Sequence, residues 1–354
     1  MTLEIFAKAF FELCTPSVLL FLCLGVVIGT VIGALPGLSA TMGIAIMTPI
    51  TFWFPPANGF ALLMGLCNAA IFSGGISAIL INTPGTPASI SQSLDGYQMY
   101  RQGKGGLALG VNVIYSFMGG IFSTLCLILF STPIANFTVT FNAPEYCMLA
   151  LFGLSMMIAV STGNVLKGTI LGVAGILLSC VGLDPLLAIP RFTFGSVDLL
   201  AGISFIPVMI GMFGIGEVLY QMYSRNRAEE AAEMKARKVN LALGRVLPSF
   251  KEFKELTIPT LIGAVEGTLI GAIPAAGGDI ASIISWGNAK KMSKHPEEYG
   301  KGSLEGLAVS STANNAVIGG AMTTMMTLGI PGDSVTAILI GSLTMYGMQP
   351  GLKM

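Results

Sequence analysis

Four Pro- or Gly-containing interruptions carry the residues that could do chemistry in an otherwise apolar sequence. In chain order they contain Pro36, Gly37, Ser39 and Thr41; Asn82, Thr83, Pro84, Gly85, Thr86 and Ser89; Gly277, Gly278 and Asp279; and Pro331, Gly332, Asp333, Ser334 and Thr336. A break in a helix frees backbone N–H and C=O groups, and the helix that follows directs partly positive N–H donors toward the break. Such a position can bind an anion, and nearby hydroxyl groups add donors.

The breaks predict a binding site for a multiply charged carboxylate, made without many buried arginines. We assign substrate binding to Pro36, Gly37, Ser39, Thr41, Asn82, Thr83, Pro84, Gly85, Thr86, Pro331, Gly332 and Ser334. The alternative is that each break only kinks a helix and supplies small residues for close packing. A single break leaves the two interpretations evenly matched, whereas four breaks in a repeated order favour binding.

Two aspartates, Asp279 and Asp333, stand in corresponding breaks of the second half of the chain. A carboxylate at membrane depth is costly and marks a functional position by default. We therefore assign cation coupling to Asp279, Asp333, Asn314, Asn315, Gly277 and Gly278. The ion could be Na⁺ in a cage of oxygen ligands or a proton on a carboxylate. Alternatively, each aspartate caps the helix that follows its break.

The composition is that of an all-α, polytopic transmembrane protein. Of the 354 residues, 53% are hydrophobic and 10% charged, against about 25% charged in soluble domains, and the mean hydropathy is +0.78. Several apolar stretches approach the ~20 residues that span a bilayer. We expect them at 17–35, 42–54, 59–81, 107–132, 145–160, 165–183, 199–222, 257–273, 280–287, 305–328 and 335–348. The zero net charge gives no reason to expect a nucleic acid partner.

The sequence offers little for catalysis, and we expect neither an enzyme nor a cofactor, with no catalytic residues to assign. None of the six cysteines forms a CxxC pair, and the one histidine, His295, lies in a Lys-rich loop. Neither a metal cluster nor a nucleophile–base pair is indicated. No P-loop pattern is present, which leaves ATP drive within this chain unsupported. The N-terminus has no clean basic region and is expected to be retained.

The breaks belong to an internal repeat. Gly29-Thr30, Gly33-Ala34 and Pro36 match Gly267-Thr268, Gly271-Ala272 and Pro274; Asn68 matches Asn315; and Pro84 matches Pro331. The charges beside these motifs are swapped between the halves, because the basic stretches 101–104, 225–255 and 290–301 flank non-equivalent ends. With basic loops placed in the cytoplasm, equivalent elements face opposite sides of the membrane, as in transporters with inverted repeats and discontinuous helices.

This pattern predicts the organisation of the chain. Residues 1–130 form a first transmembrane repeat, 131–222 connecting helices, 223–256 a charged cytoplasmic loop, and 257–354 a second repeat that is incomplete. Because both flanks of 257–287 are basic, that stretch is predicted to be a re-entrant hairpin with its tip near Pro274–Asp279. The segment 228–238 is expected to form a helix along the membrane surface.

Many ordered motifs resemble one known family. They are Ala34–Thr41, Gly74–Ala88, Asp95-Gly96-Tyr97, Gly277–Ala281, Ser293–Glu298, Gly300–Gly302, Ala313–Ala316 and Leu328–Gly332. Together they resemble the large permease subunit, TctA type, of the tripartite tricarboxylate transporters. Family members continue well past a segment like Tyr346–Gly351, and we expect this chain to lack that C-terminal region. The family's acidic residue before the Ala-Asn-Asn-Ala run is replaced here by Ser310-Ser311-Thr312.

The resemblance implies a secondary active transporter subunit of the bacterial inner membrane. Its cargo is citrate or a similar carboxylate, driven by Na⁺ or H⁺, and its partners are a small four-helix membrane subunit and a periplasmic solute-binding protein. A passive anion channel lined by broken helices is the alternative. The unmatched aspartates argue against it, because a pore ring repeats its charges in both halves.

Overall fold

A computed structural model describes residues 3–138, 165–184, 189–203, 244–274 and 276–351, with short pieces between 140 and 155 and between 208 and 219. The predicted all-α class is confirmed. The α-helices are α1 (Leu3–Leu13), α2 (Pro16–Ala34), α3 (Ala40–Thr51), α4 (Pro56–Ile81), α5 (Ile90–Arg101), α6 (Gly105–Thr138), α8 (Val165–Ser179), α12 (Phe250–Glu255), α13 (Thr257–Gly271), α14 (Gly277–Met292), α15 (Leu304–Leu328) and α16 (Ser334–Met345). Shorter elements are the helical turns η1 (Pro87–Ser89), η2 (Asp198–Ala201), η3 (Ile210–Ile215) and η5 (Pro296–Glu298), and the antiparallel strands β1 (Gly182–Leu183) and β2 (Pro190–Arg191).

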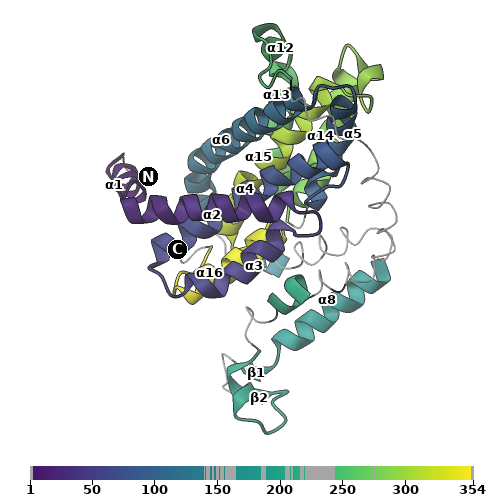
Figure 1. Ribbon diagram of the computed structural model, residues 1–354. Helices are drawn as coiled ribbons and strands as arrows, with labels where there is room; N and C mark the ends of the chain where they lie inside the picture. The colour runs from purple at the N-terminus through teal and green to yellow at the C-terminus, as the bar shows by residue number, and fades with distance from the viewer. Residues whose placement is uncertain are drawn as a thin grey trace.

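Three helices of the described part are long and apolar enough to cross a membrane, namely α2, α4 and α6 up to Phe137. The connecting helix expected at 145–160 and the surface helix at 228–238 lie largely or wholly outside the described residues, whereas the one expected at 199–222 is described in part, as the short elements η2 and η3. The predicted domain boundaries in that region stay predictions. Figure 1 shows the main bundle, with α8 and the β1–β2 pair lying away from it.

The two repeats share one backbone plan. In the first, α2 ends at Ala34, α3 begins after the N-cap Ser39, and the long helix α4 ends at Ile81 before the C-cap Asn82, which has a left-handed φ of 54°. In the second, α13 and α14 are separated by a break of the same length, and α15 ends at Leu328 before the C-cap Gly329, which has φ 70°. A second break and a further helix, α5 or α16, follow each long helix. The interruptions recognised in the sequence are thus confirmed as helix breaks.

Glycines at four-residue spacing bring the first helix of each repeat against the long helix. A Cβ atom at each of these glycines would collide with the partner backbone, so only glycine permits the close approach. The pairs are Gly25 with Leu62, Gly29 with Leu66 and Gly33 with Ala70 in the first repeat, and Gly263 with Val309, Gly267 with Ala313 and Gly271 with Val317 in the second. The small residues therefore pack helices, as the alternative interpretation of the sequence proposed, while the breaks between helices form separate features.

Helix α15 lies at the centre of the bundle, between α4, α6, α13 and α14 (Figure 1). Almost its whole length is buried, including its serines, threonines and asparagines. Several hydroxyls satisfy themselves within the helix; for example, Thr312 donates to Ala308 O at 2.8 Å and Thr323 to Gly319 O at 2.7 Å. Helix α15 is long enough to span a bilayer but is less apolar than α2, α4 and α6. Its burial inside the protein explains the lower apolarity, because few of its side chains face lipid.

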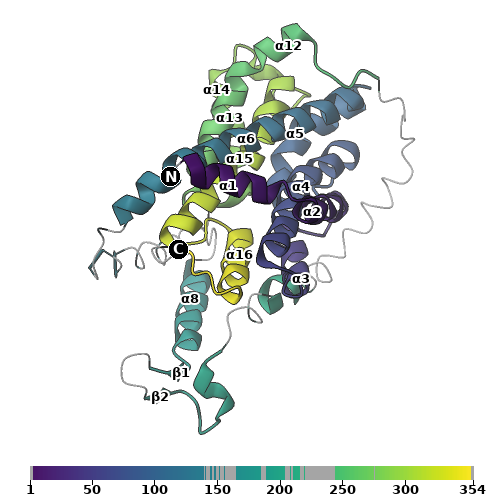
Figure 2. The ribbon, with the colours of Figure 1, turned by 90° about the vertical axis from the view of Figure 1, so that its left-hand side faces the viewer.

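Equivalent loops of the two repeats lie at opposite ends of the bundle. At one end, the loop after α14 meets α5 of the first repeat, where Gln102 donates to Lys301 O at 2.8 Å. At the other end, the loop after α3 meets α16 of the second repeat, where Tyr346 donates to Thr51 O at 2.6 Å. Figure 2 shows α12 and α14 at one end of the bundle and α3 and α16 toward the other. Inverted repeats require this arrangement.

We call the end that carries the Lys-rich loop after α14 the basic end. It also holds the short helix α12, which lies in the stretch that the sequence predicts to be a charged loop. Ser249 and Glu252 form a capping box at its start. Arg245 donates to Glu252 at 2.6 Å, and this hydrogen bond, stronger than the opposing effect of partial burial, lowers the pKa of the Glu252 carboxyl to about 2. The described part of the charged loop is therefore ordered, and it packs against the first part of α6, where a Cβ atom on Gly110 would collide with Val246 O.

Candidate functional site

A cavity of about 240 Å³ lies where the breaks of the two repeats meet. Nine sequence-predicted residues line it: Ser39, Thr41, Thr86, Gly277, Gly278, Asp279, Asn314, Asp333 and Ser334. The remaining lining residues are Ala40, Ile71, Pro87, Ala88, Val317 and Val335. All four breaks contribute, so residues separated by almost three hundred positions surround one space.

Hydrogen bonds between the repeats hold the walls of this central cavity together. The Thr41 and Ser334 hydroxyls lie 2.8 Å apart, joining the start of α3 to the start of α16. Asn314 on α15 donates to Ile71 O on α4 at 3.2 Å, and Ser282 on α14 donates to Ala88 O at 3.0 Å. The cavity therefore lies on the interface between the repeats, where inverted-repeat transporters place their sites.

Asp333 is the N-cap of α16. Its Oδ1 accepts hydrogen bonds from Thr336 N at 2.8 Å and from the Thr336 hydroxyl at 2.6 Å. The equivalent residues of the first repeat are also paired, since the Thr86 and Ser89 hydroxyls lie 2.7 Å apart. The capping alternative thus holds for Asp333, although the residue lines the cavity as well. Its carboxylate already interacts with the positive end of α16, which weakens that helix end as an anion site.

Asp279 has a different position. It is the third residue of α14, whose N-cap Ala276 supplies no side-chain hydrogen bond, and its side chain is exposed at the cavity. Gly277, two residues before it, has φ +67°, and a Cβ atom there would lie 2.7 Å from Asp279 Oδ1. The left-handed glycine therefore leaves space for the carboxylate at the cavity wall.

Asn314 adds a further oxygen to this wall. The residue is 1% exposed, and its Oδ1 has no hydrogen-bond partner among the described residues. It lies beside the start of α14, because a Cβ atom on Gly278 would be 3.1 Å from Asn314 Oδ1. Asp279, Asp333 and Asn314 thus present oxygen atoms to one cavity, and hard cations such as Na⁺ prefer oxygen ligands.

Several predicted site residues lie away from the cavity lining. They are Pro36, Gly37, Asn82, Thr83, Pro84, Gly85, Pro331, Gly332 and Asn315. Gly85 and Gly332 act in packing, since a Cβ atom at Gly85 would strike Gly33 O and one at Gly332 would lie 2.6 Å from Gly271 O. Asn82 supplies the left-handed end of α4. These residues shape the breaks, whereas Asn315 lines a separate groove on another face of α15.

Asp95 is a residue whose importance sequence reasoning missed. It is fully buried on α5, and its Oδ1 accepts from the backbone N–H groups of Gly300, Gly302 and Ser303 at 2.7, 3.1 and 2.8 Å. Its Oδ2 accepts from Trp286 Nε1 at 2.7 Å. We call this set the Asp95 clamp, and it joins the first repeat to the second at the basic end. The signal available was the resemblance of Asp95-Gly96-Tyr97 to a family motif.

The described residues contain no group of three or more His, Cys, Asp or Glu side chains that could hold a metal ion. Only two carboxylates line the central cavity, and its other polar groups are hydroxyls and one amide. The donor set fits a monovalent cation or a proton better than a tightly bound divalent metal.

Comparison with known proteins gives two similar curated sequences, both from Agrobacterium vitis. An uncharacterized 52.8 kDa protein in the TAR-I ttuC' 3' region is 37% identical over 337 residues, which make up 95% of this chain and 66% of that protein. An uncharacterized protein in the TAR-II ttuC' 3' region is 39% identical over 85 residues, 24% of this chain and 35% of that protein. The chain therefore spans about two thirds of the first relative's length and about a third of the second's. No solved structure matches it.

The family comparison covers most of the chain. The match begins within α2 and continues to the last residue, so it includes both repeats, all four breaks and the central cavity. By this match over residues 19–354, the chain belongs to the Tripartite tricarboxylate transporter TctA family.

Proposed function

We propose that this chain is the membrane permease of a binding-protein-dependent tripartite system that takes up a citrate-like carboxylate with Na⁺ or H⁺. The observation that carries the proposal is the central cavity, which collects residues from all four breaks at the interface of two inverted repeats. Family membership supports transport of tricarboxylates as a class. The proposal includes no catalytic step.

The carboxylate binds on the side formed by the first repeat. Ser39, Thr41 and Thr86 line that side with hydroxyl groups and carry no charge. Ser39 caps α3 by accepting from Met42 N at 3.1 Å, which fixes the start of that helix at the cavity. The partial positive charge at a helix N-terminus favours an anion there.

The coupling cation binds on the side formed by the second repeat. Asp279, Asp333 and Asn314 supply carboxylate and amide oxygens, and Gly277 and Gly278 form the adjoining wall. A cation between two carboxylates and a substrate anion lowers the repulsion between them. Binding of either ligand therefore favours binding of the other, as the reciprocity of linked equilibria requires.

The remaining parts of the proposal concern the setting. A small four-helix membrane subunit and a periplasmic solute-binding protein deliver the carboxylate, and the complex resides in the bacterial inner membrane. The exposed apolar faces of α2 and α6 support contact with a lipid bilayer. Nothing in the charge distribution calls for a nucleic acid partner.

The test is uptake of radiolabelled citrate into proteoliposomes that contain this chain with both partner proteins. We expect accumulation that depends on an inward Na⁺ or H⁺ gradient. Asp279→Asn keeps the size of the side chain but removes its charge. It should lower gradient-driven uptake about tenfold or more, because the cation site then keeps only one of its two carboxylates.

Asp198→Asn is the matched control, because Asp198 is an exposed aspartate at the start of η2, outside the cavity. It should transport like the unmodified protein. Citrate flux that persists without a gradient or binding protein would support the channel alternative. Unchanged ion dependence in Asp279→Asn would remove that residue from the cation site.

A further inference from the structure

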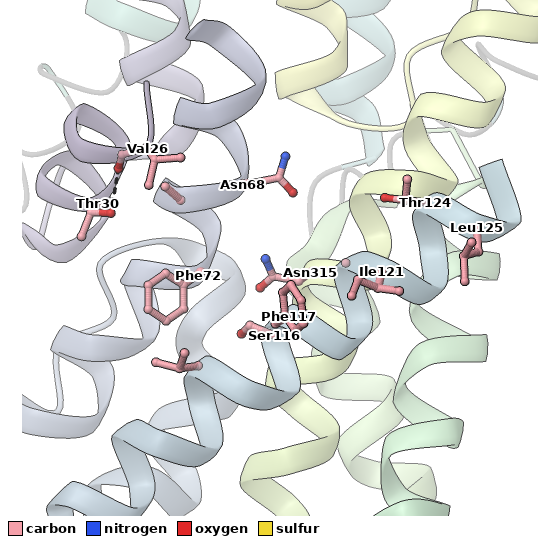
Figure 3. Close-up of a pocket in the computed structure, with 13 residues that line it drawn as sticks. Val26, Thr30, Asn68, Phe72, Ser116, Phe117, Ile121, Thr124, Leu125 and Asn315 are labelled. Carbon is pink, nitrogen blue, oxygen red and sulfur yellow. Dashed lines mark hydrogen bonds between the residues drawn. The ribbon is translucent and has the colours of Figure 1, made fainter. Parts of the chain in front are cut away.

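A second hollow of about 480 Å³ lies on another face of the bundle, between α2 and α6, with α4 and α15 as its floor. We call it the lateral groove. Its residues fall in the middle of α2, α4 and α6, the three helices that can cross a membrane. Figure 3 shows Val26 and Thr30 on one side and Ile121, Thr124 and Leu125 on the other. The groove therefore lies at mid-depth of the spanning helices.

The walls of the groove are open to the outside of the bundle and apolar. Val26 is 42%, Phe117 67% and Leu125 53% exposed. Such residues on spanning helices face hydrocarbon, so an occupant enters from the bilayer. The residues that line the groove include no charged side chain. A charged lipid headgroup finds no counter-charge among them, whereas an uncharged apolar chain fits.

The floor carries a polar group that needs a partner. Asn315 is 5% exposed, and its Oδ1 has no hydrogen-bond partner among the described residues. Figure 3 shows the amides of Asn315 and of its repeat equivalent Asn68 between the two walls. An unpaired amide oxygen in an apolar setting is costly, and a ligand that donates one hydrogen bond removes that cost.

We propose that the lateral groove binds a neutral single-chain amphiphile from the bilayer, with its hydroxyl group donating to Asn315 and its chain between α2 and α6. The apolar, uncharged walls select the chain, and the buried amide oxygen selects the hydroxyl. Asn314 borders the central cavity while Asn315 borders the groove, so the two sites lie on different faces of α15. The amphiphile site is therefore distinct from the transport cavity and independent of its substrate.

The test uses two photoreactive probes, a hexadecanol that bears a diazirine on its chain and the methyl ether of the same compound. The full chain in phosphatidylcholine nanodiscs is irradiated with each, and labelled peptides are mapped by mass spectrometry. We expect labelling of α6 around Val113–Leu125 and of α2 around Val26–Thr30. The alcohol should label about fivefold more than the ether, because one hydrogen bond to a buried acceptor contributes an affinity factor of that order.

Gly120 provides the variant that fills the groove. It lines the groove, and a Cβ atom there meets nothing within 4 Å, so Gly120→Leu should fold and reduce labelling by the alcohol about fivefold or more. Gly175→Leu on α8 is the matched control, since a Cβ there also meets nothing within 4 Å, and its labelling should stay unchanged. Asn315→Leu should abolish the preference for the alcohol over the ether.

Three results would overturn the proposal. The first is equal labelling by the alcohol and the ether in the unmodified protein, a comparison that requires no variant to fold. The second is labelling spread evenly over the exposed apolar faces and insensitive to Gly120→Leu. The third is that, when the chain is reconstituted together with a membrane subunit, the label passes mainly to that subunit, which would assign the groove to a protein helix.

Discussion

The two repeats share a backbone plan but place different chemistry at equivalent breaks. Thr41 and Thr86 of the first repeat occupy the positions of Asp279 and Asp333 in the second, and all four line one cavity. The Thr86–Ser89 pair repeats the side-chain contact of the Asp333–Thr336 cap but not its hydrogen bond to the backbone. The backbone plan therefore depends on small residues that both repeats keep. The side-chain caps differ, because Ser39 caps α3 and Asp333 caps α16, whereas α14 and η1 have no side-chain cap hydrogen bond. The negative charge at the breaks of the second repeat comes from Asp279 and Asp333, two positions whose residue type can change without altering that plan.

The largest expected effect tests the shared plan through its paired glycines, Gly85 and Gly332. Alanine at either position places a Cβ atom against the backbone of the first helix of the same repeat, at Gly33 O or Gly271 O. Each variant should lose about 3 kcal/mol of stability or fail to fold, with Gly85→Ala the worse because its contact is closer. Size-exclusion profiles and thermal melting in detergent measure the loss.

Gly120→Ala is the control, because its Cβ meets nothing within 4 Å. Stable, monodisperse protein from both Gly85→Ala and Gly332→Ala would show that the two breaks do not rest on equivalent close contacts.

The next largest effect is expected at the basic end of the interface between the repeats. Asp95→Ala at the basic end removes the acceptor of four hydrogen bonds, from Gly300, Gly302, Ser303 and Trp286, and leaves the Ser303 N–H buried without a partner. We expect a loss of about 3 kcal/mol, since buried unsatisfied donors are costly. Thermal melting of Asp95→Ala beside the exposed Asp198→Ala separates this from a general effect of losing an aspartate. Equal melting temperatures would show that the clamp contributes nothing.

A smaller effect sharpens the same comparison with single hydrogen bonds. Trp286→Phe removes one donor to the Asp95 carboxylate, and Tyr346→Phe at the opposite end removes one donor to Thr51 O. The first should cost about 2 kcal/mol and the second about 1 kcal/mol, because hydrogen bonds to charged groups are stronger than neutral ones. Differential scanning fluorimetry can rank them. A greater loss for Tyr346→Phe would reverse the proposed difference between the ends.

The helix breaks could be predicted from the sequence because Pro, Gly and their caps act locally. The inverted arrangement could also be predicted, because the motifs recur in the same order in both halves while the charges beside them are swapped. Asn314 and Asn315 show where such reasoning ends: adjacent helical residues point about 100° apart, and only packing decides which one reaches the cavity. Asp95 was missed because its partners lie about two hundred positions away, with nothing beside it in the sequence to indicate them.

The inverted relation of the two repeats is the central claim, and its most direct test is the sidedness of two exposed loop residues. Trp53 follows α3 and His295 follows α14, at equivalent places in the two repeats, and they are 87% and 64% exposed. Single cysteines at these positions, in a chain with its six cysteines replaced, are treated with a membrane-impermeant maleimide in intact and permeabilised cells. We predict that Trp53→Cys reacts in intact cells and that His295→Cys reacts only after permeabilisation. Reaction of both from the same side would contradict the inverted arrangement.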